Sequence, residues 1–292
     1  MKTHLVRTGS GRRLDVVEAG DPRGRPIVVH HGTPGCKNLA AEWVSDAESR
    51  GVRLISFSRA GYGRSSRVEG RDVAQVVADL TVVLDHLGVE RFASWGLSGG
   101  GPHVLACASL MPDRVVAAAC LSGVAPYAAE GLNWMEGMGE DNREEFGQVL
   151  AGSTDQLLES ARAAAAAMAN ASQDDLVEGM RTLLSDEDAR VARGPFGTYL
   201  LSSMVDGLGE TAFGQLDDDL AFMRPWGFEL SRIRVPTQVW QGGRDLMVPS
   251  SHGRWLSGAI PGADAHLNPD FGHLTVPAEH IPEVHSWLVA HF

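Results

Sequence analysis

The sequence contains little cysteine. Its 292 residues include only Cys36, Cys107 and Cys120, and no two of them stand at a CxxC or other metal-ligand spacing. An odd number of widely separated cysteines argues against a disulfide framework. We therefore expect free thiols in a protein of the reducing cytoplasm.

Long apolar runs are also missing. Residues 1–17 lack the apolar stretch of roughly 7–15 residues that a signal peptide needs, and no run approaches the ~20 apolar residues of a membrane-spanning helix. The longest apolar tract, residues 161–171, is interrupted by Arg162 and Asn170. We expect no signal peptide and no membrane span, and interpret this tract as a helix of a soluble protein.

Positive charge is scarce. The 25 lysines and arginines stand against 37 aspartates and glutamates, for a net charge of −12. Such a surface repels polyanions, so neither nucleic acid nor a membrane is an expected partner. The apolar fraction of 43% is that of an ordinary globular protein, and the length suits one large domain with an insertion. The expected partner is a small-molecule substrate, and the oligomeric state is left open.

The first part of the chain alternates short apolar segments with helix-like ones. Residues 4–20 alternate apolar and polar side chains around "SGRR", which predicts a hairpin of two exposed-edge strands. Four apolar strands are predicted near residues 27–29, 52–57, 91–97 and 115–121, separated by helices near 39–50, 71–88 and 102–110. Apolar strands that alternate with helices are typical of a parallel sheet covered on both faces. The predicted fold class is α/β.

The strand pattern stops after Pro126 and resumes near residue 235. Between these points, serines at helix-capping positions indicate several helix starts: Ser153 with Gln156, Ser172 before "QDD", and Ser185 with Asp188. The last part of the chain predicts two more strands and helices near 250–257 and 279–290. We predict a core domain of residues 1–126 and 232–292 with a helical insertion at 127–231.

A glycine-rich turn, "GLSGGG", follows the third apolar strand. It places Ser98 between Gly96 and Gly100, small residues that permit the sharp strand-to-helix turn of a nucleophile elbow. A glycine-rich helix start without chemistry explains the pattern equally well, because the chain has 34 glycines. A serine hydroxyl becomes a nucleophile only where a base removes its proton. The base must come from elsewhere in the sequence.

Asp245 and His273 supply the missing partners. Asp245 ends the strand-like "VWQGGRD", and His273 lies in "NPDFGHLT", in the loop after the last strand. The carboxyl ends of parallel strands meet at one edge of a sheet, and the order Ser98, Asp245, His273 is that of serine enzymes with such sheets. We predict that Ser98 attacks, His273 acts as base and Asp245 orients it. Activity should rise with pH near ~6.5, where a free imidazole loses its proton.

Other histidines are weaker candidates for the base. None of them follows a strand end as His273 does: His103, His252, His266 and His280. The loop "HHGTPG" ends the first central strand, and there we expect the backbone N–H of Thr33, together with that of Gly99, to stabilise an oxyanion. His30 and His31 in this loop are expected to be structural.

These motifs together resemble the α/β-hydrolase superfamily, over nearly the whole chain outside the insertion. "HHGTPG" looks like its oxyanion loop, "GLSGG" like its nucleophile elbow, "GGRDLMVP" like its acid turn and "FGHL" like its histidine loop. "SRAGYGRS" is similar to a further signature that usually begins with Asp where this chain has Ser58, a departure that bears on loop packing. The resemblance implies an eight-stranded, mostly parallel sheet and a helical cap after the sixth strand.

The resemblance also implies acyl transfer to water without a cofactor or metal. A serine at position 98 speaks against the dehalogenases and epoxide hydrolases of the superfamily, which form their ester through a carboxylate. Carboxylesterase, lipase-like and lactonase activities stay open. An apolar substrate pocket is suggested by large apolar residues of the insertion: Trp134, Met135, Met138, Phe196, Tyr199, Met204, Phe222 and Trp226.

Two alternatives remain beside the esterase. "HGTPG" is close to the "HGGPG" of proline iminopeptidases, and Glu210 and Asp217 to Asp219 offer carboxylates for a peptide's free amine. Charge runs are usually solvated, however, and "DDDL" is more typical of an exposed first turn of a helix, favoured by the helix dipole. The other alternative is of a different class, a small-ligand receptor or a cofactor-free lyase or oxygenase, because fold does not settle function.

Overall fold

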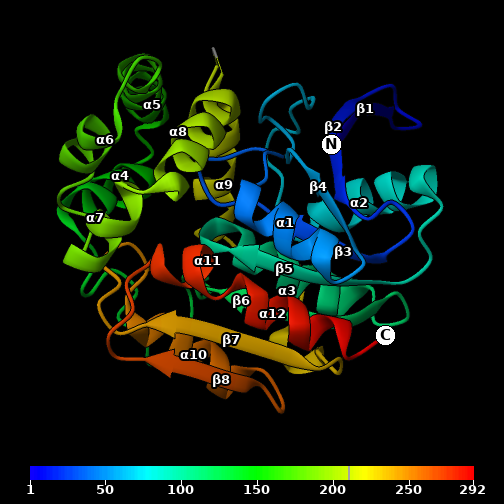
Figure 1. Cartoon of the computed structure of the whole chain (residues 1–292). Helices are drawn as coiled ribbons and strands as arrows, with labels where there is room; N and C mark the ends of the chain where they lie inside the picture. The colour runs from blue at the N-terminus through cyan, green and yellow to red at the C-terminus, as the bar shows by residue number, and fades with distance from the viewer. Residues whose placement is uncertain (210) are drawn as a thin grey trace.

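The computed structural model describes residues 1–209 and 211–292 and is built around one eight-stranded sheet. Its strands lie in the order β1-β2-β4-β3-β5-β6-β7-β8 (Figure 1). They are β1 (Lys2–Arg7), β2 (Arg13–Gly20), β3 (Arg25–His30), β4 (Val52–Phe57), β5 (Phe92–Leu97), β6 (Val115–Leu121), β7 (Thr237–Gly242) and β8 (Asp264–Asn268). Only the pairings of β2 with β1 and β4 are antiparallel. The mostly parallel sheet predicted from the sequence is thus confirmed.

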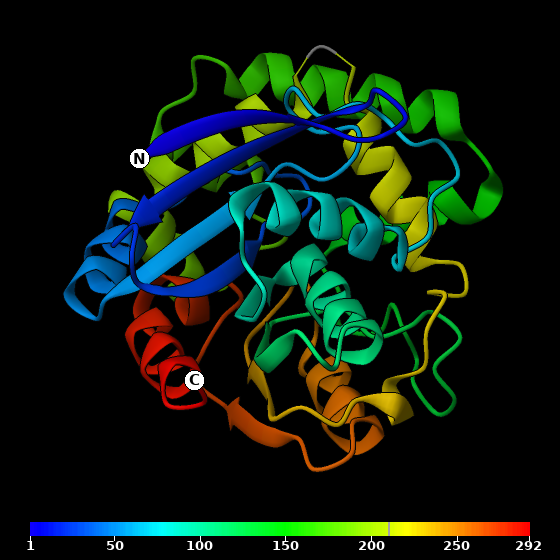
Figure 2. The same ribbon diagram turned by 90° about the vertical axis from the view of Figure 1, so that its right-hand side faces the viewer.

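Helices cover both faces of the sheet. In Figure 2, α2 (Gln75–Leu87), α3 (Gly101–Leu110) and α10 (Ser250–Ala259) lie on one face, and α1 (Ala41–Ser49) and α12 (Ile281–Val289) on the other. Every residue of β5, β6 and β7 is buried. A strand covered on both sides has no exposed face, which explains why apolar residues predominate in β5 and β6. β7 also buries Thr237, Gln238 and Gln241.

The amino-terminal hairpin forms in the predicted place, but one of its strands is not an exposed edge. β2 lies between β1 and β4 and is largely buried, whereas β1 alone forms the edge. The expectation of two exposed-edge strands is wrong for β2. Leu14 and Val16 of this strand belong to the buried core. The alternating pattern predicts the hairpin but does not show that β2 also pairs with β4.

The segment between β6 and β7 carries helices and, among its described residues, no strand. The helices are α4 (Glu140–Ala151), α5 (Thr154–Met168), α6 (Gln173–Gly179), α7 (Asp186–Ala192), α8 (Pro195–Leu208), α9 (Phe213–Phe222) and the short η2 (Leu230–Arg232). In Figure 1, α4 to α8 lie beyond the carboxyl end of the sheet, toward which β5 and β7 point. Residues 127–231 are called the insertion below.

Helix capping in the insertion follows the predicted pattern at two of three positions. Ser172 and Ser185 each accept the backbone N–H three residues on, while the carboxylates of Asp175 and Asp188 accept the serine N–H in return. Ser153 precedes α5 but makes no side-chain capping bond. Its ψ of 53° is not the extended conformation that a capping serine adopts, so the expected box fails there.

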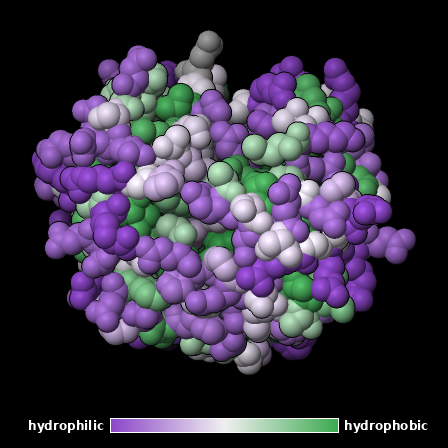
Figure 3. Space-filling model, in the orientation of Figure 1, coloured by the Kyte–Doolittle hydropathy of each residue, from purple (hydrophilic) through white to green (hydrophobic). Residues whose placement is uncertain are grey.

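The surface is mainly polar. On the face shown in Figure 3, hydrophilic side chains dominate and apolar ones gather in small separate groups. In the part of the chain that the structure describes, no helix combines the length and hydropathy that crossing a bilayer requires. The alanine-rich tract lies in α5 up to Met168, where the helix ends.

Candidate active site

Ser98 lies in the sharp turn between β5 and α3. Its φ of 52° is in the left-handed region, which a residue with a side chain rarely adopts. The glycines around it are required by close packing: a Cβ on Gly96 would lie 2.3 Å from the Gly100 carbonyl oxygen, and one on Gly100 would lie 2.2 Å from that of His30. The backbone therefore has the strained strand-to-helix turn expected at this position.

His273 and Asp245 form a buried hydrogen-bonded pair. The Asp245 carboxylate can only accept, so His273 Nδ1–H donates to Asp245 Oδ2 at 2.7 Å, which leaves Nε2 without a proton in the neutral ring. The carboxylate also accepts the N–H groups of Met247 and Val248 at 2.9 and 2.8 Å and the amide of Gln241 at 2.8 Å. These bonds fix the carboxylate, and through it the imidazole.

The two groups shift each other's proton affinity. Burial raises the pKa of Asp245, and the charge of His273 and its hydrogen bond only partly oppose this, so the pKa lies above its ordinary value. Burial lowers the pKa of His273, but the charge and hydrogen bond of Asp245 and the charge of Asp188 outweigh it. The net pKa of His273 therefore lies above the ordinary value of 6.5.

Ser98, Gly99, Thr33 and His273 line one cavity of about 350 Å³. The structure thus brings the predicted residues to one space, although no hydrogen bond joins the Ser98 hydroxyl to His273 among the described residues. Most other lining side chains are apolar: Leu97, Val124, Phe146, Met168, Met180, Leu183, Leu200, Met204, Leu208, Phe222, Met247, Val248 and Leu274. Asp141, Asn142, Glu145, Gln215 and Asp219 add a polar side.

The two expected oxyanion donors lie next to each other. A Cβ on Gly99 would lie 2.2 Å from Thr33 Oγ1, so the elbow and the loop after β3 are in contact. Gly99 precedes the first hydrogen bond of its helical turn, and the first N–H groups of a helix have no partner within it. Among the described residues, the Thr33 N–H has no protein acceptor either.

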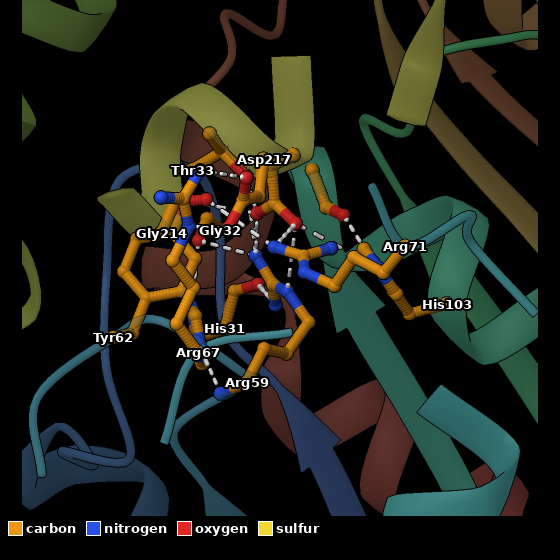
Figure 4. Close-up of polar contacts among 12 residues, drawn as sticks. His31, Gly32, Thr33, Arg59, Tyr62, Arg67, Arg71, His103, Gly214 and Asp217 are labelled. Atoms are coloured by element: carbon orange, nitrogen blue, oxygen red, sulfur yellow. Dashed lines mark hydrogen bonds and ion pairs between the residues drawn. The ribbon is translucent and has the colours of Figure 1, made fainter. Parts of the chain in front are cut away.

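A buried network that the sequence does not reveal holds the loop after β3 (Figure 4). Arg59 donates to the carbonyl oxygens of His31 and Gly32 and to Thr33 Oγ1. Asp218, from α9 of the insertion, accepts from Arg59 Nη2 at 2.6 Å and from the Thr33 hydroxyl at 2.6 Å. The charged atoms of this network are unexposed, which makes its hydrogen bonds strong and its geometry rigid.

Asp218 serves two further donors. Tyr62 OH donates to Asp218 Oδ2 at 2.9 Å, and Arg71 Nη2 lies 2.7 Å from Oδ1. Burial would raise the pKa of the Asp218 carboxyl, but the charges of Arg59 and Arg71 hold it well below its ordinary value. Asp218 is therefore a carboxylate that ties four side chains to α9.

The acidic run of the insertion is not an exposed helix start. α9 begins at Phe213, so Asp217 to Asp219 lie in its middle, and all three are buried. Asp217 pairs with Arg67 at 2.9 Å and Asp218 with the network above. The prediction of a solvated first turn is wrong, because arginines that follow β4 supply the charge partners. Glu210 lies outside the described residues.

Asp219 differs from its neighbours in having a carboxyl partner. Burial raises its pKa well above the ordinary value, and the charge and hydrogen bond of Glu145 add to this shift. Both residues face the cavity, and Gln215 Nε2 donates to Glu145 at 2.6 Å. The polar side of the cavity thus contains a carboxyl pair in which Asp219 holds its proton more tightly than an isolated acid does.

Of the large apolar residues expected in a pocket, only Met204 and Phe222 line the cavity. The others pack elsewhere: Trp134 against Phe146 and His252, Phe196 and Tyr199 against Trp43, and Trp226 on Phe228. Helix periodicity alone does not distinguish a side chain that packs helices from one that faces a ligand.

The other histidines considered as a base, and those of the loop after β3, lie in structural positions. His30 is buried with Nε2 3.8 Å from Cys107 Sγ. His31 accepts the Arg59 N–H at 3.1 Å, and His103 Nδ1 lies 2.8 Å from the Gly99 carbonyl oxygen. The other three are bound outside the cavity: His252 by Trp134, His266 by Asp264 and His280 by Glu283. Ser58 accepts the Lys37 N–H at 3.1 Å, a loop-packing role as expected.

Comparisons with known proteins show the family and the fold. The family model for the alpha/beta hydrolase fold matches residues 25–279. Epoxide hydrolase A of Mycobacterium tuberculosis is 37% identical over 124 residues, 40% of this chain but only 37% of that protein's length. Proline iminopeptidase of Neisseria gonorrhoeae is 25% identical over 86% of this chain and 83% of its own. The structure of a thermophilic esterase from Thermogutta terrifontis matches all of both chains, with a TM-score of 0.69 at 19% identity, which shows the shared fold.

Proposed function

Because the chain belongs to the alpha/beta hydrolase fold family, we propose that it is a serine hydrolase that cleaves a carboxylic ester of a small, partly apolar molecule. The observation that carries this proposal is the shared cavity of Ser98, at a φ of 52°, and His273, whose Nδ1 is bound to Asp245. Serine in place of a carboxylate nucleophile favours acyl transfer over the opening of an epoxide.

The proposed reaction has two steps. His273 Nε2 takes the Ser98 proton as Oγ attacks the ester carbonyl, and the carbonyl oxygen becomes an oxyanion bound by the N–H groups of Thr33 and Gly99. His273 then returns the proton to the leaving alcohol, and an acyl-serine remains. Water, activated by the same imidazole, releases the acid and restores Ser98. Asp245 stabilises the imidazolium in both steps and stays ionised.

The apolar cavity supports an apolar acyl or alcohol group in the substrate. Four methionines line it: Met168 of α5, Met180 just after α6, Met204 of α8 and Met247 of the loop after β7. Methionine adapts to ligands of different shape. We propose that the insertion serves as a cap over this cavity. The buried free thiols of Cys36, Cys107 and Cys120 suit the reducing cytoplasm that we propose as its location.

The test is a hydrolysis screen over p-nitrophenyl esters of graded acyl length, with Ser98→Ala as the control. We expect turnover by the wild type and a loss of at least about a thousandfold in Ser98→Ala, since a nucleophile is essential to the acyl-enzyme. A fluorophosphonate probe should label the wild type and not the variant. A folded wild-type protein that neither labels nor hydrolyses any ester would leave the receptor or lyase class as the better assignment.

The carboxyl pair supports a second candidate, a proline iminopeptidase-like aminopeptidase. Glu145 and Asp219 face the cavity and offer a site for a substrate ammonium group. Proline and alanine β-naphthylamides tested beside the esters decide between the two. Amide turnover that exceeds ester turnover, and that is lost in Glu145→Gln, would favour the peptidase.

A further inference from the structure

Asp188 of α7 is in direct contact with the loop that carries His273. Asp188 Oδ2 accepts the His273 backbone N–H at 2.9 Å, and Oδ1 accepts that of Leu274 at 2.7 Å. The hydroxyl of Ser185 donates to Oδ2 at 2.8 Å. The side chain is 0% exposed, and no salt bridge neutralises it among the described residues. One carboxylate thus caps its own helix and binds two consecutive amides of a distant loop.

The loop is in closest contact with Asp188 at Gly272. A Cβ there would lie 2.3 Å from each oxygen of the carboxylate. A side chain at 272 therefore forces the loop and the carboxylate apart. The position of His273 relative to the core depends on α7, which belongs to the insertion.

Asp218 of α9 has the same relation to the loop that carries Thr33. It accepts the Thr33 hydroxyl directly, and it holds Arg59, which donates to the carbonyl oxygens of His31 and Gly32 (Figure 4). A carbonyl held on one side of a peptide plane directs the following N–H to the other side. The bond from Arg59 to Gly32 thus sets the direction of the Thr33 N–H.

We propose that the insertion positions the active site. Asp188 binds the loop that carries His273 (the histidine loop), and Asp218 binds the loop that carries Thr33 (the oxyanion loop). Both are positioning residues, because neither lines the cavity. The inference rests on the proposed serine-hydrolase function. The insertion then does more than cover the cavity: each of two of its helices fixes one catalytic loop.

The first test replaces Asp188 by Asn, which keeps the shape and removes the charge. Asp245 and Asp188 are the charged groups that act on His273, and Asp141, Glu145 and Asp219 line the same cavity. The Arg190–Glu279 ion pair joins α7 to the following helix α11 (Thr275–Glu279). Loss of one negative charge lowers the proton affinity of the imidazole. The pH midpoint of fluorophosphonate labelling at Ser98 should therefore move to lower pH. If the imidazole ring also shifts by a fraction of an ångström, the labelling rate at the high-pH plateau should be about tenfold lower.

Asp175→Asn is the matched control. Asp175 has the same capping-box bonds to Ser172 at the start of α6, but it is exposed and touches no catalytic loop. It should lose the same helix cap and keep the wild-type midpoint. If Asp188→Asn also keeps the wild-type pH midpoint, the proposal for the histidine loop is overturned. If Asp188→Asn does not fold, Gly272→Ala is used instead, because the new Cβ separates the loop from the Asp188 carboxylate. A wild-type pH midpoint in Gly272→Ala would then overturn the proposal for this loop.

The second test compares Asp218→Asn with Asp217→Asn. Both aspartates are buried on α9 and paired with arginine, but only Asp218 contacts the oxyanion loop. We expect Asp218→Asn to lose about tenfold or more both in kcat and in affinity for a trifluoromethyl ketone, while its KM and its pH midpoint stay unchanged. Asp217→Asn should keep the wild-type kcat, ketone affinity, KM and pH midpoint. Thr33→Val, which loses the hydroxyl but keeps the N–H, should show the same loss and remains informative if Asp218→Asn does not fold. Wild-type kcat in Thr33→Val and in any folded Asp218→Asn overturns this part.

Failure of the proposed function is distinguishable from failure of this inference. A wild-type protein that takes no fluorophosphonate refutes the hydrolase. The His273 titration, followed by NMR of labelled histidine with His273→Gln for assignment, then still tests Asp188. An unchanged titration in Asp188→Asn refutes the positioning role alone.

Discussion

His273 Nδ1 and Asp245 Oδ2 lie 2.7 Å apart in a site where both side chains are almost completely buried. A buried imidazole without a partner would lose its proton easily. Here the neighbouring carboxylates reverse that tendency and place the pKa of His273 above 6.5. The base of the proposed reaction is thus tuned by its partners, and this has a direct consequence for the pH dependence.

The first prediction concerns this pH dependence. His273 must be neutral to accept the Ser98 proton, so kcat/KM should be low when the imidazole is protonated and rise as pH passes its pKa. Because the pKa lies above the free value, the midpoint should lie above 6.5, higher than the sequence alone predicts. The measurement is kcat/KM for an activated ester between pH 5 and 9. A flat profile, or a midpoint below 6.5, contradicts the role of His273.

The second prediction concerns Asp245→Asn. An uncharged amide at 245 stabilises the imidazolium far less than the carboxylate, and its NH₂ group can hold the ring in the wrong tautomer. We therefore expect kcat to fall by up to ~10⁴-fold, as in other serine enzymes. Asp174→Asn is the matched control, since Asp174 is an exposed acid of α6 that pairs with Arg193 and contacts neither catalytic loop. Its activity should equal that of the wild type. A decrease of less than tenfold in Asp245→Asn is incompatible with the triad.

Ser98, Asp245 and His273 could be proposed from the sequence because each lies just after a predicted strand. The pattern is weakest before His273, where β8 is mixed in polarity and partly exposed. Parallel strands bring their carboxyl ends to one edge, so strand order alone places these residues near one another. The same reasoning places the loop with Thr33 beside Gly99. These parts of the site depend on local pattern and topology, which the sequence contains.

The contacts of the insertion could not be predicted in this way. α9 has no serine, threonine or aspartate at its N-cap, where Ala212 stands with a φ of 56°, so the acidic run looked like the start of the helix. Its true partners, such as Arg67 for Asp217, lie 150 residues away in the chain. Spacing rules describe neighbours along a helix or strand. They carry no information on which distant arginine meets which aspartate.

Gly99→Ala is the third prediction. The new Cβ would lie 2.2 Å from Thr33 Oγ1 and 2.7 Å from Thr33 Cβ, so the oxyanion loop must move away from the elbow. Loss of one oxyanion donor costs about 10²–10³-fold in kcat. KM for the ester should change little, because the apolar cavity is retained. The two constants are measured separately in steady-state assays.

Gly147→Ala is the control for that substitution. Nothing lies within 4 Å of a Cβ at Gly147, which is inside α4, so this variant should keep full kcat and gain stability by about 0.5–1 kcal/mol. If Gly99→Ala keeps wild-type kcat in the same assay, Gly99 is not part of the oxyanion site.

The last prediction concerns substrate size. Met204 projects from α8 into the cavity of about 350 Å³, so Met204→Trp reduces the space for an acyl chain. Each methylene that a pocket no longer accepts costs about 1–3 kcal/mol of transition-state binding, equal to 10–200-fold in kcat/KM. Long-chain p-nitrophenyl esters should therefore lose at least about tenfold relative to the acetate. Leu150→Trp, at an exposed position of α4, should keep the wild-type profile. If Met204→Trp shows the same dependence of kcat/KM on acyl length as Leu150→Trp, the acyl group binds away from Met204. The part of the cavity lined by α8 is then not the acyl site.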